Sequence, residues 1–191
     1  MKDIVIIPIR ELSKGVRNKN ILKFSNGLTS LEMISSSLKE LTNIDIFVNT
    51  ESDLLSMFAE SINLSVIKRS RHLSNDKSTI DDVIKNILEN PILQNYKNLW
   101  VIQATCPLIS SNSLIKLKAE LESNKDIDTV FSAKKIKDFI WQNAESNQRR
   151  LYESRENRQT QKNPYIAESG AVTITKIKSL RETKNRFLNI N

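Results

Sequence analysis

Short apolar runs alternate with helix-period segments along the first 133 residues, and this alternation limits the chain to few folds. Apolar runs of strand length joined by amphipathic helices are typical of βαβ units, whose parallel strands are buried on both faces. The pattern predicts strands over residues 4–9, 44–50, 65–68, 99–104, 129–133 and 171–175. It predicts helices over 30–41, after the capping residue Ser52, after a capping box at 78–81, over 111–123, and after the last strand. We therefore expect an α/β fold with a Rossmann-like, mostly parallel sheet flanked by helices.

The length of 191 residues suits a single domain, which we place at residues 1–191. No apolar stretch approaches the ~20 residues that a membrane-spanning helix requires, so we expect no membrane partner. The single cysteine, Cys106, excludes an intrachain disulfide and fits a reducing compartment. We therefore expect a cytoplasmic protein.

Residues 134–165 break the regular alternation. They are polar, basic and weakly periodic, with the isolated aromatic residues Trp141, Tyr152 and Tyr165. The whole net charge of +7 arises in residues 134–191, because acidic and basic residues balance in the rest of the chain. This excess is consistent with an anionic partner and equally with a solvated surface. Because a long irregular segment inside a compact domain is usually functional, we interpret 134–165 as an excursion from the sheet.

The loop after the first predicted strand concentrates positive charge where α/β sheets bind ligands. It contains Arg10, Lys14, Arg17 and Lys19 against the single acid Glu11. Ligands bind beyond the carboxyl ends of the strands in such sheets, and a triphosphate requires cations and free backbone amides. The Gly-x-x-x-x-Gly-Lys-Ser/Thr and Gly-x-Gly-x-x-Gly patterns are both absent, which argues against an ATPase and an NAD enzyme. The loop predicts a phosphate site, with a merely solvated basic loop as the alternative.

Several segments resemble, in order, the motifs of the acylneuraminate cytidylyltransferases. Residues 7–15 (Ile-Pro-Ile-Arg-Glu-Leu-Ser-Lys-Gly) with Lys19-Asn20 resemble the opening motif, in which relatives commonly have Gly-Gly before Ser-Lys-Gly. Residues 49–52, 69–81 and 101–108 resemble the Ser-Thr-Asp, Arg-Pro-x-x-Leu-x-x-Asp and Leu-Gln-Pro-Thr-Ser-Pro-Leu motifs. Weaker similarities follow at 139–141, 158–159 and 169–172. The match spans about residues 4–175 and implies the fold of nucleotide-diphospho-sugar transferases.

The resemblance implies roles at the matching positions. For the triphosphate it implies the catalytic cations Arg10, Lys14 and Lys19 with Ser13 and Asn20, and for cytosine and ribose it implies Arg69, Ser78 and Thr79. For the sugar acid it implies Gln103, Ser169 and Arg158, whose guanidinium suits a carboxylate. The alternative is that Ser78 only caps a helix and Arg158 is only a surface charge. Gln103 is harder to explain structurally, since a buried amide requires partners.

The resemblance also implies an activity and partners. A nonulosonic acid, which is a sialic-acid-like 2-keto sugar acid, would react with CTP in the presence of Mg²⁺ to give a CMP-sugar and pyrophosphate. The excursion at 134–165 would cross to the other subunit of a homodimer. Neuraminic, legionaminic and pseudaminic acids all stay open as acceptors. A nucleic-acid-binding module is a further alternative at a pI of about 9.5, but aromatic residues make up only 6% and no stacking cluster occurs.

Three departures from the family pattern modify this expectation. Relatives have an aromatic residue at the position of Thr173 and an arginine at that of Ala167. They also have an Asp-Ile-Asp-Thr-x-x-Asp segment whose carboxylates bind Mg²⁺, and these 191 residues do not contain one. We therefore assign no metal ligands, with Asp76, Asp81 and Asp82 as the next candidates, and expect CTP binding with weak or no turnover. The alternative function is a catalytically impaired nucleotide- or sugar-binding relative.

Overall fold

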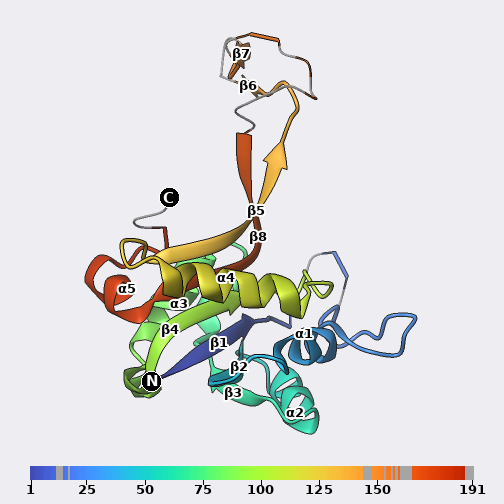
Figure 1. The fold of residues 1–191 in the computed structure, drawn as a ribbon. Coiled ribbons are helices and arrows are strands. Elements are labelled where there is room, and N and C mark those ends of the chain that lie inside the picture. Colours follow the sequence, from blue (N-terminus) through green and yellow to red (C-terminus); the bar gives the residue numbers. More distant parts are fainter. Residues whose placement is uncertain are drawn as a thin grey trace. The chain divides into compact units, whose positions relative to one another are not determined.

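A six-stranded sheet organises the chain (Figure 1). The computed structural model describes residues 1–11, 15–16, 18–143, 148–152, 154–155, 157, 159 and 165–187. In the order β3-β2-β1-β4-β8-β5, the strands are β3 (Ser65–Lys68), β2 (Ile44–Thr50), β1 (Lys2–Pro8), β4 (Tyr96–Ile102), β8 (Tyr165–Lys176) and β5 (Thr129–Ile136). The β1–β2, β2–β3 and β1–β4 pairs are parallel, and β4–β8 is antiparallel. The predicted α/β fold with a mostly parallel sheet is confirmed.

The strand order reverses at β1, which places a crevice beside its carboxyl end. From β1 the chain passes to β2 and β3 on one side and only later to β4 on the other side. The carboxyl ends of β1 and β4 are therefore adjacent, with connections that leave in opposite directions. Open α/β sheets bind ligands at such a switch point.

Helices cover both faces of the sheet and divide the core in two (Figure 1). Among the described residues, the α-helices are α1 (Ser30–Leu38), α2 (Asp53–Ser61), α3 (Ile80–Leu88), α4 (Ser111–Ser123) and α5 (Ile177–Thr183). Alternate residues of β1 pack into different clusters: Val5 and Ile7 join α1, α2 and α4, whereas Ile4 and Ile6 join α3 and α5. This two-sided burial explains why β1 is apolar throughout.

The starts of the helices follow the expected capping chemistry with one correction. Ser52 caps α2 by accepting a hydrogen bond from the amide of Leu55 at 3.3 Å, as predicted. The capping box predicted at 78–81 lies one residue later, because Thr79 and Asp82 are the reciprocal pair. Asp82 accepts from the Thr79 amide at 2.9 Å, and the Thr79 hydroxyl accepts from the Asp82 amide at 3.1 Å.

Several predicted boundaries differ from the observed ones. Helix α1 ends at Leu38 rather than residue 41, while β4 begins at Tyr96, β5 extends to Ile136, and β8 begins at Tyr165. The extra residues of β5 and β8 are mostly half-buried or exposed, so they lack the apolar pattern that marks a buried strand. Two short 3₁₀ helices, η1 (Arg71–Ser74) and η2 (Pro91–Asn95), were not predicted.

Residues 132–169 form a compact unit of their own, separate from the unit of residues 1–131 and 170–191. The segment predicted to leave the sheet, residues 134–165, falls within this unit, which contains the antiparallel strands β6 (Trp141–Asn143) and β7 (Gln148–Arg150). Tyr152 contacts Phe139 and Trp141, with ring centroids 5.0 and 5.9 Å away. The guanidinium of Arg155 lies 5.2 Å from the centroid of the Phe139 ring. A role of this unit in dimer formation stays a prediction.

Across the part of the chain that is described, no helix is long and apolar enough to span a lipid bilayer.

Candidate active site

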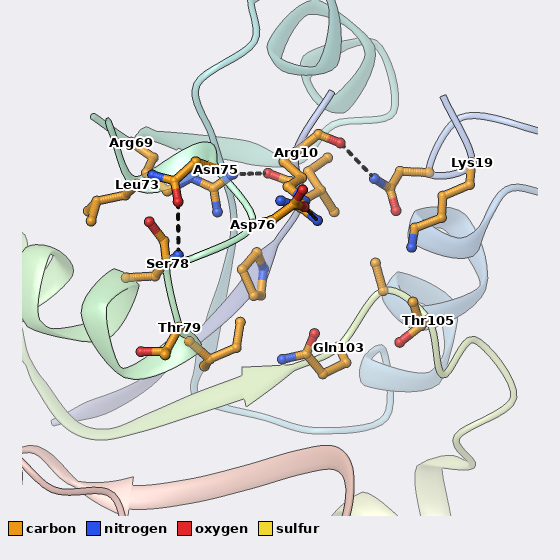
Figure 2. A pocket seen from close by; sticks show the side chains of 16 residues that line it. Arg10, Lys19, Arg69, Leu73, Asn75, Asp76, Ser78, Thr79, Gln103 and Thr105 are labelled. Atoms are coloured by element: carbon orange, nitrogen blue, oxygen red, sulfur yellow. Dashed lines mark hydrogen bonds and ion pairs between the residues drawn. The ribbon is translucent and has the colours of Figure 1, made fainter. Parts of the chain in front are cut away.

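A cavity of about 240 Å³ lies at the switch point, beyond the carboxyl ends of β1 and β4 (Figure 2). Its walls come from the loop after β1, the end of β3, the loop before α3 and the end of β4. Seven residues predicted from the sequence line it: Arg10, Lys19, Asn20, Arg69, Ser78, Thr79 and Gln103. The structure therefore brings together residues that are up to 93 positions apart in the chain.

The first wall is the cation-rich loop, which hydrogen bonds hold close to its own start. Asn18 adopts a left-handed conformation with φ of 54°, and its carbonyl accepts from the amide of Ile21 at 3.0 Å, which turns the chain. The buried side chain of Asn20 donates back to the carbonyl of Arg10 at 3.3 Å. Arg10 Nη2 lies 2.8 Å from Oδ1 of Asp76, on the opposite wall. The side chain of Asn20 therefore stabilises the loop, whereas that of Arg10 faces the cavity.

Three polar side chains around the cavity have no hydrogen-bond or ion-pair partner among the described residues. They are Lys19, the half-buried Gln103 at the end of β4, and Thr105 two residues later (Figure 2). The backbone of Gln103 is fixed, since its amide donates to the carbonyl of Ala171 at 2.9 Å and its carbonyl accepts from Cys106. A rigid backbone with free side-chain groups is suited to binding a polar ligand.

The loop between β3 and α3 forms the facing wall and is held by its own side chains. Asn75 Oδ1 accepts from the amides of Lys77 at 2.7 Å and Ser78 at 3.1 Å, while Asn75 Nδ2 donates to the carbonyl of His72. The hydroxyl of Ser78 donates to the same carbonyl at 3.3 Å. The hydroxyl of Thr79 donates to Asp82 at 2.8 Å. Both hydroxyls line the cavity and also stabilise the wall.

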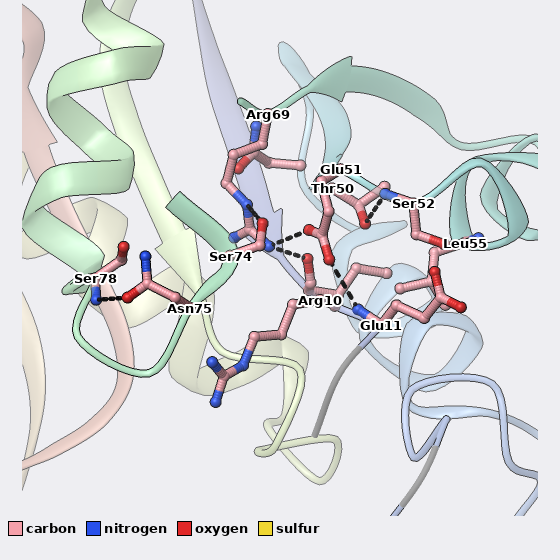
Figure 3. Close-up of polar contacts among 12 residues, drawn as sticks. Arg10, Glu11, Thr50, Glu51, Ser52, Leu55, Arg69, Ser74, Asn75 and Ser78 are labelled. Carbon is pink, nitrogen blue, oxygen red and sulfur yellow. Dashed lines mark hydrogen bonds and ion pairs between the residues drawn. The ribbon is translucent and has the colours of Figure 1, made fainter. Parts of the chain in front are cut away.

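Arg69 lies at the bottom of the site with its guanidinium almost fully buried (Figure 3). Its Nη2 donates to the carbonyl of Ile9 at 2.7 Å and to Glu51 at 2.6 Å, and its Nε donates to Ser74 at 3.2 Å. Burial acts to raise the pKa of Glu51, but the hydrogen bonds from Arg69 and Ser74, with backbone amides, hold it below its ordinary value. This buried pair joins the two walls from below.

The remaining predicted site residues lie elsewhere or outside the described residues. Ser13, Lys14 and Arg158 are among the residues that the structure does not describe. Ser169 belongs to the unit of residues 132–169, where its hydroxyl donates to the carbonyl of Ser132 at 2.9 Å. A role for Ser169 in binding the sugar acid stays a prediction.

The cavity also includes residues to which sequence reasoning gave no role. Asn75 could have been found, because an asparagine side chain in a loop often accepts a hydrogen bond from the backbone amide two residues later and so closes a turn. Thr105 lies inside the matched motif at 101–108 but carries no distinguishing signal of its own. Leu73, Ile80 and Val83 supply an apolar wall.

The carboxylates near the cavity do not form a site for the expected Mg²⁺. Asp76 is the one carboxylate among the described lining residues, and Arg10 contacts it. Asp82 caps α3, and Asp81 accepts from Arg186 Nε at 2.7 Å. No cluster of three or more His, Cys, Asp or Glu side chains suited to a metal ion occurs among the described residues. Among the described residues, a single carboxylate that Arg10 already contacts does not make a site for a protein-held Mg²⁺.

Thr173, at the position where relatives have an aromatic residue, forms a polar contact instead. Thr173 is buried on β8, and its hydroxyl accepts from Arg186 Nη1 at 3.3 Å. The carbonyl of Arg186 in turn accepts from the hydroxyls of Thr129 and Thr175. Phe187 follows with an edge-to-face contact to Phe131 at 5.6 Å between ring centroids. Sequence reasoning missed this docking of residues 184–187, because single polar contacts leave no periodic signal.

An α/β sheet with a cation-lined cavity at its switch point is typical of proteins that bind nucleotides. The family profile described as "Cytidylyltransferase" matches residues 4–180. The chain therefore belongs to the cytidylyltransferase family.

Two curated relatives share the name N-acylneuraminate cytidylyltransferase. The one from Streptococcus agalactiae serotype V is 33% identical over 138 residues, which are 71% of this chain and 33% of the relative. The one from Escherichia coli O18:K1:H7 is 30% identical over 142 residues, which are 73% of this chain and 33% of the relative. The matched part of the chain thus spans about a third of the length of these relatives.

Solved structures support the fold. A CMP:2-keto-3-deoxy-manno-octonic acid synthetase complexed with CTP superposes with a TM-score of 0.68 at 14% identity, covering 95% of this chain and 77% of that chain. A 2-C-methyl-D-erythritol 4-phosphate cytidylyltransferase from Francisella tularensis gives a TM-score of 0.67 at 18% identity, covering 96% and 76%. At these identities the similarity establishes the fold alone.

Proposed function

We propose that this domain transfers a cytidylyl group from CTP to a nonulosonic acid. The anomeric hydroxyl of the sugar acid attacks the α-phosphorus of CTP, and the bond from that phosphorus to the oxygen bridging to the β-phosphorus breaks. The hydroxyl proton is released, and the products are a CMP-sugar and pyrophosphate. The observation that carries the proposal is that seven residues, assigned to the substrates by their match to the family motifs, line one cavity.

Arg10 and Lys19 are the residues assigned to the phosphates. Both line the cavity, and the ammonium of Lys19 has no partner among the described residues. Negative charge builds up on the phosphate oxygens and on leaving pyrophosphate in the transition state, so fixed cations there lower the barrier. Ser13 and Lys14, predicted for the same role, lie outside the described residues.

The wall before α3 is assigned to the nucleoside. Ser78 and Thr79 line the cavity, and their hydroxyls already donate to His72 and Asp82. Their oxygens keep lone pairs with which they can accept further hydrogen bonds. Arg69 supports this wall through Ser74. These three residues therefore shape the nucleoside side of the site as well as facing it.

Gln103 is assigned to the sugar acid. Its amide carries two donors and an acceptor, all without a partner among the described residues, and its backbone is fixed by β8. Arg158 and Ser169 stay predicted contacts to the same substrate. The class of acceptor follows from the curated relatives, which are named as N-acylneuraminate cytidylyltransferases.

A homodimer is part of the proposal. Trp141 is 49% exposed and lies in a cluster of aromatic rings on the unit of residues 132–169. Exposed aromatic clusters are typical anchors of protein interfaces. Light scattering should give a dimer mass at micromolar concentration, and a Trp141→Ser variant should shift it toward the monomer. A cytoplasmic location likewise stays a prediction.

A nucleotide-binding relative with impaired catalysis is the second candidate function. Among the described residues, the acidic side chains around the cavity do not form a metal site, and this favours the second candidate. In this case CTP binds, because the cations are present, while turnover is weak.

A coupled product assay tests the proposal. The protein is incubated with CTP, Mg²⁺ and a panel of nonulosonic acids, and both pyrophosphate and CMP-sugar are quantified. Equal amounts of the two products, formed with one acceptor and not with ATP or GTP in place of CTP, support the transferase. CTP binding without product supports the impaired relative. Failure to bind CTP contradicts both.

A further inference from the structure

Three residues that directly follow three parallel strands are joined by hydrogen bonds at the base of the cavity. Ile9 follows β1, Glu51 follows β2 and Arg69 follows β3. The strand ladder continues into Ile9 and Arg69, since the Ile9 amide donates to Asn49 and the Arg69 amide to Thr50, both at 3.0 Å. The backbone positions of Ile9 and Arg69 are therefore set by the sheet, and Glu51 contacts Arg69 and the loop after β1 through its side chain.

Glu51 holds two different loops at the same time (Figure 3). Its Oε1 accepts from the amide of Glu11 at 3.1 Å, in the loop that carries Arg10 and Lys19. Its Oε2 accepts from Arg69 Nη2 at 2.6 Å, and Arg69 reaches Ser74 in the loop before α3. One carboxylate thus touches the base of the phosphate wall directly and the nucleoside wall through Arg69.

The burial of this pair separates it from the other ion pairs in the neighbourhood. The side chains of Arg69 and Glu51 are 4% and 12% exposed, whereas those of Lys68 and Asp53 in the adjacent pair are 55% and 83% exposed. A buried ion pair costs desolvation and contributes little net stability, and in some proteins such pairs are retained because they specify one arrangement. Here the arrangement that it specifies is the relative placement of the two cavity walls.

We propose that Glu51 is a positioning residue for the nucleotide site, holding the Glu11 amide and Arg69 together so that Arg10 and Lys19 face the opposite wall at a fixed distance. The inference rests on the proposed function in that CTP is the ligand. Glu51 does not line the cavity and does not touch the substrate, so it acts through its two partners.

The chemistry of the carboxylate makes a sharp test available. A carboxylate accepts on both oxygens, whereas an amide of the same shape accepts on one oxygen and donates on its nitrogen. Glu51→Gln therefore cannot keep both contacts, because its NH₂ group faces either the Arg69 guanidinium or the Glu11 amide. Asp53→Asn is the matched control, since it removes the same charge near the same end of the sheet without contacting either wall.

The experiment measures CTP affinity by calorimetry and backbone hydrogen exchange by mass spectrometry, after circular dichroism has shown that the variants are folded. For Glu51→Gln we expect CTP binding about tenfold weaker or more, and faster exchange in at least one of the two peptides that contain Glu11 and Ser74. For Asp53→Asn we expect both readouts to match the wild type. If Glu51→Gln does not fold, Glu51→Asp serves, because its shorter side chain keeps the charge but cannot span both partners.

Two results would overturn the proposal. One is wild-type CTP affinity in a folded Glu51→Gln variant, or in Glu51→Asp when it replaces that variant. The other is unchanged exchange in both peptides, and this readout decides the question even if the wild type does not bind CTP. A failure of the proposed function is thereby distinguished from a failure of the positioning role.

Discussion

Nη2 of Arg10 lies 2.8 Å from Oδ1 of Asp76, so an acidic side chain neutralises part of the charge of a cation assigned to phosphate binding. The two residues come from opposite walls of the cavity, the loop after β1 and the loop before α3. A phosphate that binds Arg10 competes with this carboxylate. The pair therefore links the two walls, and its acidic member lowers the attraction of the site for anions.

Asp76→Asn should strengthen the binding of pyrophosphate. Removing the acidic charge leaves Arg10 with a larger net attraction for anions. Both side chains are at least a third exposed, so solvent screens the pair and the gain should be only about two- to fivefold at low ionic strength. Calorimetry at low and at physiological ionic strength measures it, and the gain should shrink as salt increases. Weaker pyrophosphate binding in Asp76→Asn would show instead that Asp76 helps to hold the ligand.

Asp3→Ala should destabilise the fold without touching the cavity. Asp3 is fully buried and accepts from Asn98 at 2.9 Å and from the indole of Trp100 at 3.0 Å, which leaves both donors unpaired when it is removed. The expected loss in the free energy of unfolding is on the order of 2–3 kcal/mol. Urea denaturation followed by far-ultraviolet circular dichroism measures it, with the exposed Asp126→Ala as control. Equal stability of the two variants would contradict the buried network.

Tyr96 should ionise at a higher pH than an ordinary tyrosine side chain. Burial, together with the hydrogen bond to Asp45 and the charge of Asp45, raises the pKa of Tyr96 from 10.0 to about 12. A raised folded-state pKa contributes stability that is fully present below the unfolded value, and this stability is lost as the pH rises from 10.0 through about 12. An ultraviolet titration of tyrosinate in the wild type and in Tyr96→Phe isolates this group. A difference curve centred near the unfolded value would contradict the contact.

The sequence predicted the buried part of the sheet well and its exposed part poorly. Strand β1 is apolar because both of its faces are covered, and its pattern was sufficient to place it. The first half of β8 is half-buried or exposed, so tertiary pairing determines it and no apolar alternation reveals it. The capping box at Thr79 was misplaced by one residue because serine and threonine are adjacent there and both are good caps.

The residues of the cavity could be predicted more fully than their contacts. The cation-rich loop after the first strand gave Arg10 and Lys19, because ligands bind beyond strand ends in such sheets, whereas the family resemblance gave Arg69 and Gln103. The sequence could not show that Arg69 is turned inward toward Glu51. Such pairings depend on side-chain direction across strands that are distant in sequence, and one sequence carries no information on that direction.

The central claim is that this cavity binds CTP through the cations of the loop after β1. Lys19→Ala removes one charge-assisted phosphate contact, which should cost on the order of 1.5–3 kcal/mol of binding free energy. Lys23→Ala, an exposed lysine of the same segment that does not line the cavity, is the matched control. The binding free energy that Lys19→Ala should lose corresponds to a loss of roughly ten- to 150-fold in CTP affinity.

Calorimetric titration of the wild type, Lys19→Ala and Lys23→Ala with CTP, UTP, ATP and GTP tests this claim most directly. We expect CTP to bind more tightly than the other three nucleotides, Lys19→Ala to lose at least tenfold in CTP affinity, and Lys23→Ala to stay close to the wild type. Equal affinity for all four nucleotides, or unchanged CTP binding in Lys19→Ala, would contradict it.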